Sequence, residues 1–164
     1  MKREIAGGLP PHLAQAREVD LPPAWKDKLE AVFKVIAASN SQVILLTGGE
    51  NRRKDMFAVC LGRRLKNSYA RTMQWIYGAD LPQFDALPRA GISIVSGVEK
   101  IPEHKSARLN SLIRESCVSG WFTILLCRDV ESIETALGRD IVDYISHESI
   151  SVDLSINRKA IFEL

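Results

Sequence analysis

The 164-residue sequence is poor in cysteine and histidine, and neither residue type has the spacing of a metal site. The three cysteines, Cys60, Cys117 and Cys127, form no C-x-x-C pair, so we expect buried free thiols. The three histidines are scattered along the chain without ligand spacing. Because there is also no G-x-S-x-G motif, the sequence predicts no metal and no catalytic nucleophile of this kind.

Long apolar runs and a strong excess of one charge are also missing. No segment reaches the about 18 apolar residues that a membrane span needs, so we expect a cytoplasmic protein without membrane insertion. The formal net charge is only +2, which is too small to indicate nucleic-acid binding from composition alone. With 46% hydrophobic and 26% charged residues, the chain has the composition of a globular domain.

Proline and glycine divide the chain into an extended N-terminal arm, residues 1–23, and a single domain, residues 24–164. Helical periodicity predicts helices over 24–38, 53–66, 103–118 and 131–145, with at most a short helix at 83–87. Short apolar runs predict strands over 42–47, 72–77, 91–95, 122–127 and 149–154. This alternation predicts an α/β fold with three layers, α/β/α, around a five-stranded, mostly parallel sheet.

The turn after the first predicted strand has the frame of a phosphate-binding loop. Gly48 and Lys54 match the first glycine and the lysine of G-x-x-x-x-G-K-[S/T], in which backbone N–H groups and the lysine hold phosphates. Arg53 replaces the second glycine, whose backbone conformation arginine adopts only with strain. Asp55 replaces the hydroxyl that binds Mg²⁺ and adds negative charge beside any triphosphate.

The arrangement around this loop resembles the core of the AAA+ ATPases, in the branch of bacterial replication initiators, their regulators and helicase loaders. The resemblance covers roughly residues 21–156. In that family an apolar strand ends in paired acidic residues, but here Ser96 and Gly97 follow the strand, and neither is a general base or a strong Mg²⁺ ligand. Arg128 stands where the family has a polar sensor residue. In the family, a helical lid follows the fifth strand of the core. For this chain the resemblance implies a P-loop NTPase-like core without that lid.

Because several catalytic positions depart from the family together, we favour a catalytically inactive domain that serves as a protein-interaction or regulatory module in a larger assembly. This hypothesis predicts a protein partner, no catalytic residue and no resident cofactor, and it leaves a homo-oligomer open. The alternative is a nucleotide-binding protein or weak ATPase that binds ATP or ADP at a helix N-terminus. The vestigial phosphate site would consist of Gly48, Gly49, Lys54, Asp55 and Arg128.

A second alternative is a nucleic-acid-binding accessory protein. Basic residues gather between positions 52 and 71, where Asp55 is the only acidic residue. The candidate contacts are Arg52, Arg53, Arg63, Arg64 and Lys66. On a helix these positions spread over a broad arc, so a solvated basic face is the competing explanation.

Overall fold

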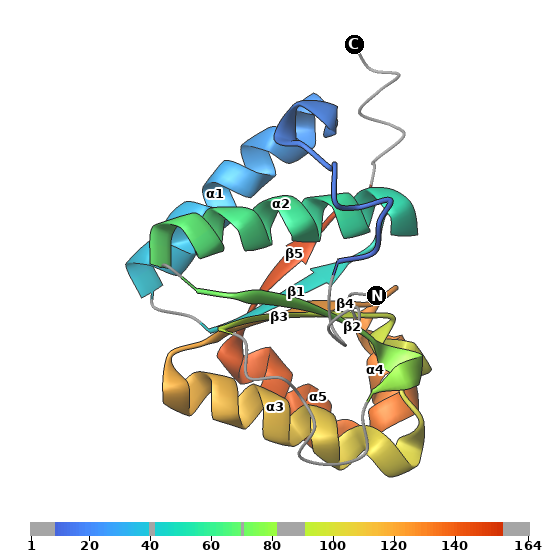
Figure 1. The fold of residues 1–164 in the computed structure, drawn as a ribbon. Coiled ribbons are helices and arrows are strands. Elements are labelled where there is room, and N and C mark those ends of the chain that lie inside the picture. Colours follow the sequence, from blue (N-terminus) through green and yellow to red (C-terminus); the bar gives the residue numbers. More distant parts are fainter. Residues whose placement is uncertain (1–8, 40–41, 70, 82–90, 156–164) are drawn as a thin grey trace, which may run out of the picture.

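The computed structural model describes residues 9–39, 42–69, 71–81 and 91–155, and a five-stranded sheet forms the middle of three layers (Figure 1). Its strands are β1 (Val43–Thr47), β2 (Met73–Tyr77), β3 (Ile92–Ser96), β4 (Phe122–Leu126) and β5 (Ser149–Asp153). They lie in the order β2-β3-β4-β1-β5, and every neighbouring pair is parallel. The predicted fold class is confirmed, with a sheet that is parallel throughout.

Helices cover both faces of the sheet, because parallel strands need crossover connections that shield the sheet from water. One face carries α1 (Pro23–Ser39) and α2 (Asn51–Tyr69), and the other carries α3 (Ser106–Ser119), α4 (Val130–Leu137) and α5 (Arg139–Glu148) (Figure 1). The described connections contain the short 3-10 helices η1 (Glu18–Asp20), η2 (Gly78–Asp80), η3 (Val98–Lys100) and η4 (Glu103–Lys105). None of the helices in the described ranges is long and apolar enough to cross a bilayer.

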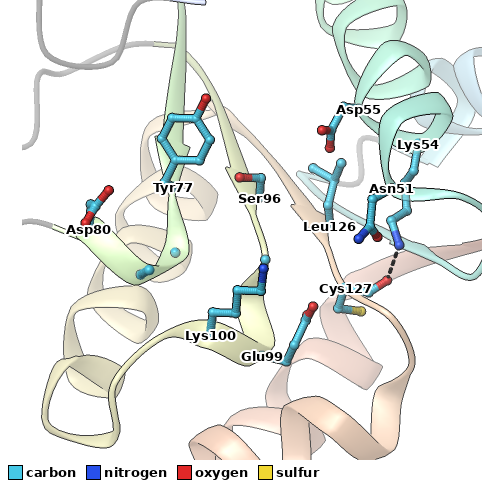
Figure 2. Close-up of a pocket in the computed structure, with 13 residues that line it drawn as sticks. Asn51, Lys54, Asp55, Tyr77, Asp80, Ser96, Glu99, Lys100, Leu126 and Cys127 are labelled. Atoms are coloured by element: carbon cyan, nitrogen blue, oxygen red, sulfur yellow. Dashed lines mark hydrogen bonds between the residues drawn. The ribbon is translucent and has the colours of Figure 1, made fainter. Parts of the chain in front are cut away.

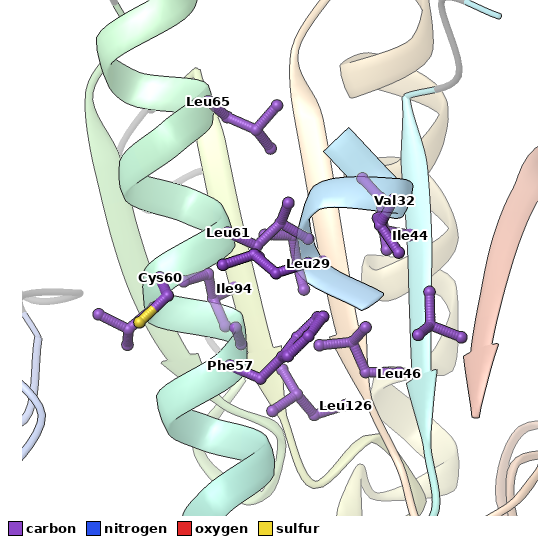
Figure 3. Close-up of a cluster of buried hydrophobic side chains, with 14 of the residues drawn as sticks. Leu29, Val32, Ile44, Leu46, Phe57, Cys60, Leu61, Leu65, Ile94 and Leu126 are labelled. Atoms are coloured by element: carbon purple, nitrogen blue, oxygen red, sulfur yellow. The ribbon is translucent and has the colours of Figure 1, made fainter. Parts of the chain in front are cut away.

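The core consists of two apolar clusters, one on each face of the sheet. On the side of α1 and α2, Ile44 and Leu46 of β1 pack in one cluster with Phe57 of α2 (Figure 3). Val43 and Leu45 of the same strand belong to the cluster on the opposite face. Successive residues of a strand point to opposite faces, so a strand that is covered on both sides must be apolar throughout.

Two predicted helices have different boundaries in the structure. The helix predicted over 131–145 is in fact two helices, α4 and α5, which meet at Gly138. Gly138 has φ of +90°, a conformation that glycine adopts far more readily than other residues. The helix predicted over 103–118 begins as η4 after Pro102, and its α-helical part starts only at Ser106. The short helix predicted at 83–87 lies outside the described residues.

Residues 9–22, which are the described part of the predicted N-terminal arm that precedes α1, contact the core. Three of their side chains are buried in the cluster on the side of α1 and α2, namely Leu13, Ala16 and Leu21. The Arg63 guanidinium of α2 donates hydrogen bonds to the carbonyl oxygens of Ala14 and Ala16. These contacts hold the segment against α2. The predicted boundary between an arm, residues 1–23, and a domain, residues 24–164, stays a prediction.

Candidate functional site

A very short turn joins β1 to α2. Only Gly48, Gly49 and Glu50 separate the two elements, and both glycines have positive φ, +69° and +74°. The Gly48 N–H donates to the carbonyl oxygen of Arg128 over 3.0 Å, so the turn is tied to the segment that follows β4. A Cβ atom at Gly49 would lie 2.8 Å from the carbonyl oxygen of Leu154, so this turn requires a residue without a side chain.

The remaining residues of the phosphate-loop frame belong to α2 itself. Arg53 lies in the first turn of this helix and pairs with Glu50, with 3.5 Å between Nε and Oε2. The Lys54 N–H donates to the carbonyl oxygen of Glu50 over 2.9 Å, which is the spacing of an α-helical hydrogen bond. Helical backbone therefore starts three residues before Lys54, and Arg53 follows the helix without the strained conformation that the sequence pattern suggested.

Lys54 points into the interior, toward the carboxyl end of β4. Its side chain is only 3% exposed, and its ammonium donates a hydrogen bond of 2.8 Å to the carbonyl oxygen of Cys127 (Figure 2). Cys127 in turn donates its backbone N–H to the carbonyl oxygen of Leu46 in β1. The lysine therefore connects the first turns of α2 to two adjacent strands at one edge of the sheet.

Asp55 lies beside Lys54 and is half-buried. Burial raises the pKa of its carboxyl group to about 6, because the charged form loses contact with water. The positive charges of Lys54 and His12 act in the opposite direction and only partly offset this effect. At neutral pH the site therefore contains a carboxylate whose charge is poorly solvated.

A pocket of 360 Å³ opens beside these two residues at the carboxyl edge of the sheet. Lys54, Asp55 and Asn51 line one side, and Tyr77 and Asp80 line the other, with Glu99 and Lys100 between them (Figure 2). Ser96, which ends β3, and Gly97, which follows it, also line the pocket. Tyr77, Asp80 and Lys100 were not predicted as site residues. Tyr77 ends β2, Asp80 follows β2 and Lys100 follows β3, and the carboxyl ends of both strands must meet this edge in a parallel sheet.

The structure brings together only part of the predicted phosphate site. Lys54 and Asp55 line the first pocket, whereas Arg128 lines an adjoining, more open pocket of 490 Å³. Arg128 is exposed, pairs with Asp129 over 3.4 Å and donates to the Ser132 hydroxyl over 2.9 Å. Glu99 lines both pockets. Among the described residues there is no group of His, Cys, Asp and Glu that could hold a metal ion.

The predicted nucleic-acid contacts are partly engaged inside the protein. Arg64 donates to both carboxylate oxygens of Glu18, over 2.6 and 2.9 Å, and also pairs with Glu30. Arg63 donates to the N-terminal segment, as described above. Arg52 and Lys66 are exposed, and Arg53 is exposed beside Glu50. Three of the five candidates, Arg53, Arg63 and Arg64, therefore have partners within the protein that a nucleic acid would have to replace.

Comparisons with known proteins identify the fold. No protein-family description and no curated protein sequence matches this chain. Among solved structures, DnaA from Aquifex aeolicus with bound AMPPCP matches 91% of this chain with a TM-score of 0.69 at 10% identity. A putative primosome component from Streptococcus pyogenes serotype M3 matches 91% of this chain with a TM-score of 0.67 at 11% identity. DnaI matches 90% of it with a TM-score of 0.68 at 10% identity.

These matches confirm the predicted resemblance at the level of the fold. The chain has the α/β fold of the AAA+ domains found in replication initiators and helicase loaders. It covers 52% of the length of the Aquifex aeolicus DnaA chain. By contrast, it covers 91% of the primosome component and 92% of DnaI. At sequence identities of 10–11% the likeness establishes the fold alone.

Proposed function

We propose that this chain is a non-hydrolysing AAA+-like domain that acts as a protein-interaction or regulatory module in a cytoplasmic DNA-replication assembly. One observation carries the proposal: the lysine of the phosphate-loop frame is buried and bonded to the Cys127 carbonyl. In a working loop this ammonium reaches the β- and γ-phosphates, and the loop N–H groups surround them. Here the surrounding backbone is already helical from Asn51 onward.

The end of β3 supports the same conclusion. Hydrolysis needs a group that positions Mg²⁺ and a group that activates water, and carboxylates usually serve both roles. At this edge β3 ends in Ser96, followed by Gly97, and neither side chain can do so. Asp55 adds a poorly solvated negative charge where a triphosphate would lie, which opposes binding of an anion.

The likeness to replication proteins suggests the kind of assembly. The matched structures include a DNA replication initiation factor, a primosome component and a DnaA bound to single-stranded DNA. A shared AAA+ fold suggests a shared process by analogy alone, because one fold supports many functions. We therefore propose a protein partner from replication initiation or from the primosome.

A nucleotide-response experiment tests the inactive site. Phosphate release and the melting temperature are measured with MgATP and with ADP, for the wild-type protein and for Lys54→Ala. We expect no turnover and no rise in melting temperature with nucleotide for either protein, since a ligand that binds the folded state must stabilise it. A rise that Lys54→Ala abolishes would support the nucleotide-binding alternative and overturn the proposal.

A binding experiment tests the partner. The purified protein is mixed with the replication initiator and the primosome proteins of the same organism, and complexes are measured by sedimentation with and without ATP. We expect a complex that forms equally well without nucleotide. A complex that forms only with ATP, or none with any of these proteins, would contradict the proposed module.

A further inference from the structure

The pocket at the carboxyl edge has one polar atom without a partner. The Glu99 oxygen Oε2 is shielded from solvent and accepts no hydrogen bond from any of the described residues. A buried acceptor without a donor is unfavourable, and more so when the group is charged. Lys54, a buried donor that also lines this pocket, is bonded to the Cys127 carbonyl. Because Glu99 itself lines the pocket, its carboxyl group offers an acceptor at the pocket wall to a donor group from outside.

The charges around this pocket favour a cation. The first pocket and the adjoining pocket meet at Glu99, and together they are lined by five carboxylates and three basic groups. The carboxylates belong to Asp55, Asp80, Glu99, Asp129 and Glu131, and the basic groups to Lys54, Lys100 and Arg128. Arg128 pairs with Asp129, which leaves the Glu99 side of the pocket acidic. A phosphate group would meet this excess of negative charge, whereas a cation would be attracted by it.

The aromatic ring of Tyr77 at the rim of the first pocket indicates which kind of cation fits there. Tyr77 is 49% exposed although it lines the pocket, and Trp75 supports its ring from within, with 6.1 Å between the ring centroids. A planar guanidinium stacks on an aromatic face and donates two parallel hydrogen bonds to a carboxylate. The more strongly hydrated ammonium of lysine gains less from both contacts.

We propose that this pocket receives an arginine side chain of a protein partner, with Glu99 as the acceptor of its guanidinium and the Tyr77 ring beside it. The inference rests on the proposed function, because it names the chemistry by which the module recognises its partner. The pocket of 360 Å³ is large enough for one side chain and too acidic to favour a nucleotide.

An NMR titration of the full chain tests this proposal. The probes are two blocked tripeptides, acetyl-Gly-Arg-Gly-amide and acetyl-Gly-citrulline-Gly-amide, which differ only in charge at the side-chain end. We expect saturable shifts of the Tyr77, Gly97 and Glu99 amides with the arginine peptide and none with the citrulline peptide. Equal shifts with both peptides, or shifts confined to other residues, would overturn the assignment.

Two pocket variants and one control identify the contacts. We expect Glu99→Gln to weaken binding of the arginine peptide by about tenfold or more, since hydrogen bonds to charged groups contribute at that level. Tyr77→Leu, which keeps an apolar side chain but removes the ring, should also weaken it. Glu103→Gln, an exposed glutamate of η4 outside both pockets, should leave the affinity unchanged. Wild-type affinity in both pocket variants would overturn the proposal.

Titrations with inorganic phosphate and MgATP separate the two proposals. If phosphate shifts the same amides and Lys54→Ala abolishes the effect, the pocket is an anion site and the arginine assignment is wrong. If MgATP binds and is hydrolysed, the proposed function is wrong as well. If neither the arginine peptide nor any nucleotide binds, only the arginine assignment fails.

Discussion

Lys54 and Cys127, which are 73 positions apart, are joined by a hydrogen bond of 2.8 Å from the lysine ammonium to the cysteine carbonyl oxygen. This contact ties α2 to the end of β4, and the neighbouring bond from Gly48 N–H to the Arg128 carbonyl does the same for the turn before α2. The lysine at this position binds phosphate in the family that the chain resembles. In this chain, Lys54 instead has a structural partner, the Cys127 carbonyl. The contact explains why a lysine can stay at this position while the residues around it differ from the motif.

Lys54→Ala is therefore expected to lower stability. The substitution leaves the buried Cys127 carbonyl without its donor and removes the packed stem of the lysine, which together should reduce the free energy of unfolding by about 1–3 kcal/mol. Urea denaturation measures the change. Lys66→Ala, an exposed lysine of the same helix, is the matched control and should stay within about 0.5 kcal/mol of wild type. Equal stability of the two variants would contradict a structural role for Lys54.

Asp55 predicts a defined pH dependence. Its pKa is raised from 3.8 to about 6 in the folded protein, so the folded state binds a proton more tightly than the unfolded state. The contribution of the Asp55 carboxyl group to the free energy of unfolding is therefore fully present below pH 3.8 and is lost as the pH rises through about 6. Asp55→Asn should remove that loss and raise the free energy of unfolding at pH 7 by about 1–2 kcal/mol, with allowance for partial solvent screening.

The pH comparison distinguishes this effect from a general change in packing. Unfolding free energies of wild type and Asp55→Asn are measured at pH 4 and pH 7, and the gain should be present at pH 7 and largely absent at pH 4. Asp143→Asn, an exposed position on α5, is the control for loss of one negative charge. A gain of the same size at both pH values would show that the burial of the Asp55 charge is not its cause.

The sequence predicted the sheet well because its signal is local. The run Val43–Leu46 is apolar throughout, which only a strand covered on both faces requires, and the structure buries it completely. Gly138 carried a signal that was missed, since a glycine inside a helical pattern can mark the end of one helix and the start of another. The sequence could not predict that Lys54 bonds to the Cys127 carbonyl. Every residue has a backbone carbonyl, so the residue type gives no signal for such a partner. Glu99 lies just after β3 without a motif that marks it, and only the fold places its carboxylate between two pockets.

Two glycines with positive φ should respond differently to alanine. Gly49 and Gly138 both have positive φ, +74° and +90°, so alanine strains the backbone at either position. A Cβ at Gly49 would also meet the Leu154 carbonyl at 2.8 Å, whereas a Cβ at Gly138 would have none of the described residues within 4 Å. We expect Gly138→Ala to lower the free energy of unfolding by about 1 kcal/mol and Gly49→Ala by at least about 2 kcal/mol. Thermal or urea unfolding of both variants measures the difference, and equal losses would contradict the close approach at the β1–α2 turn.

Charge reversal in α2 tests the nucleic-acid alternative. Arg63 and Arg64 hold the segment around Glu18, so Arg63→Glu with Arg64→Glu should lower stability and increase amide hydrogen exchange in residues 13–21. Arg52→Glu with Lys66→Glu, which changes two exposed positions of the same helix, should leave stability nearly unchanged.

Fluorescence anisotropy with single-stranded DNA at several salt concentrations is measured for both pairs. We expect weak binding at most, with no special loss for the Arg63 and Arg64 pair. Tight binding that falls steeply with salt, and that this pair alone abolishes while the protein stays folded, would instead assign these two arginines to nucleic acid.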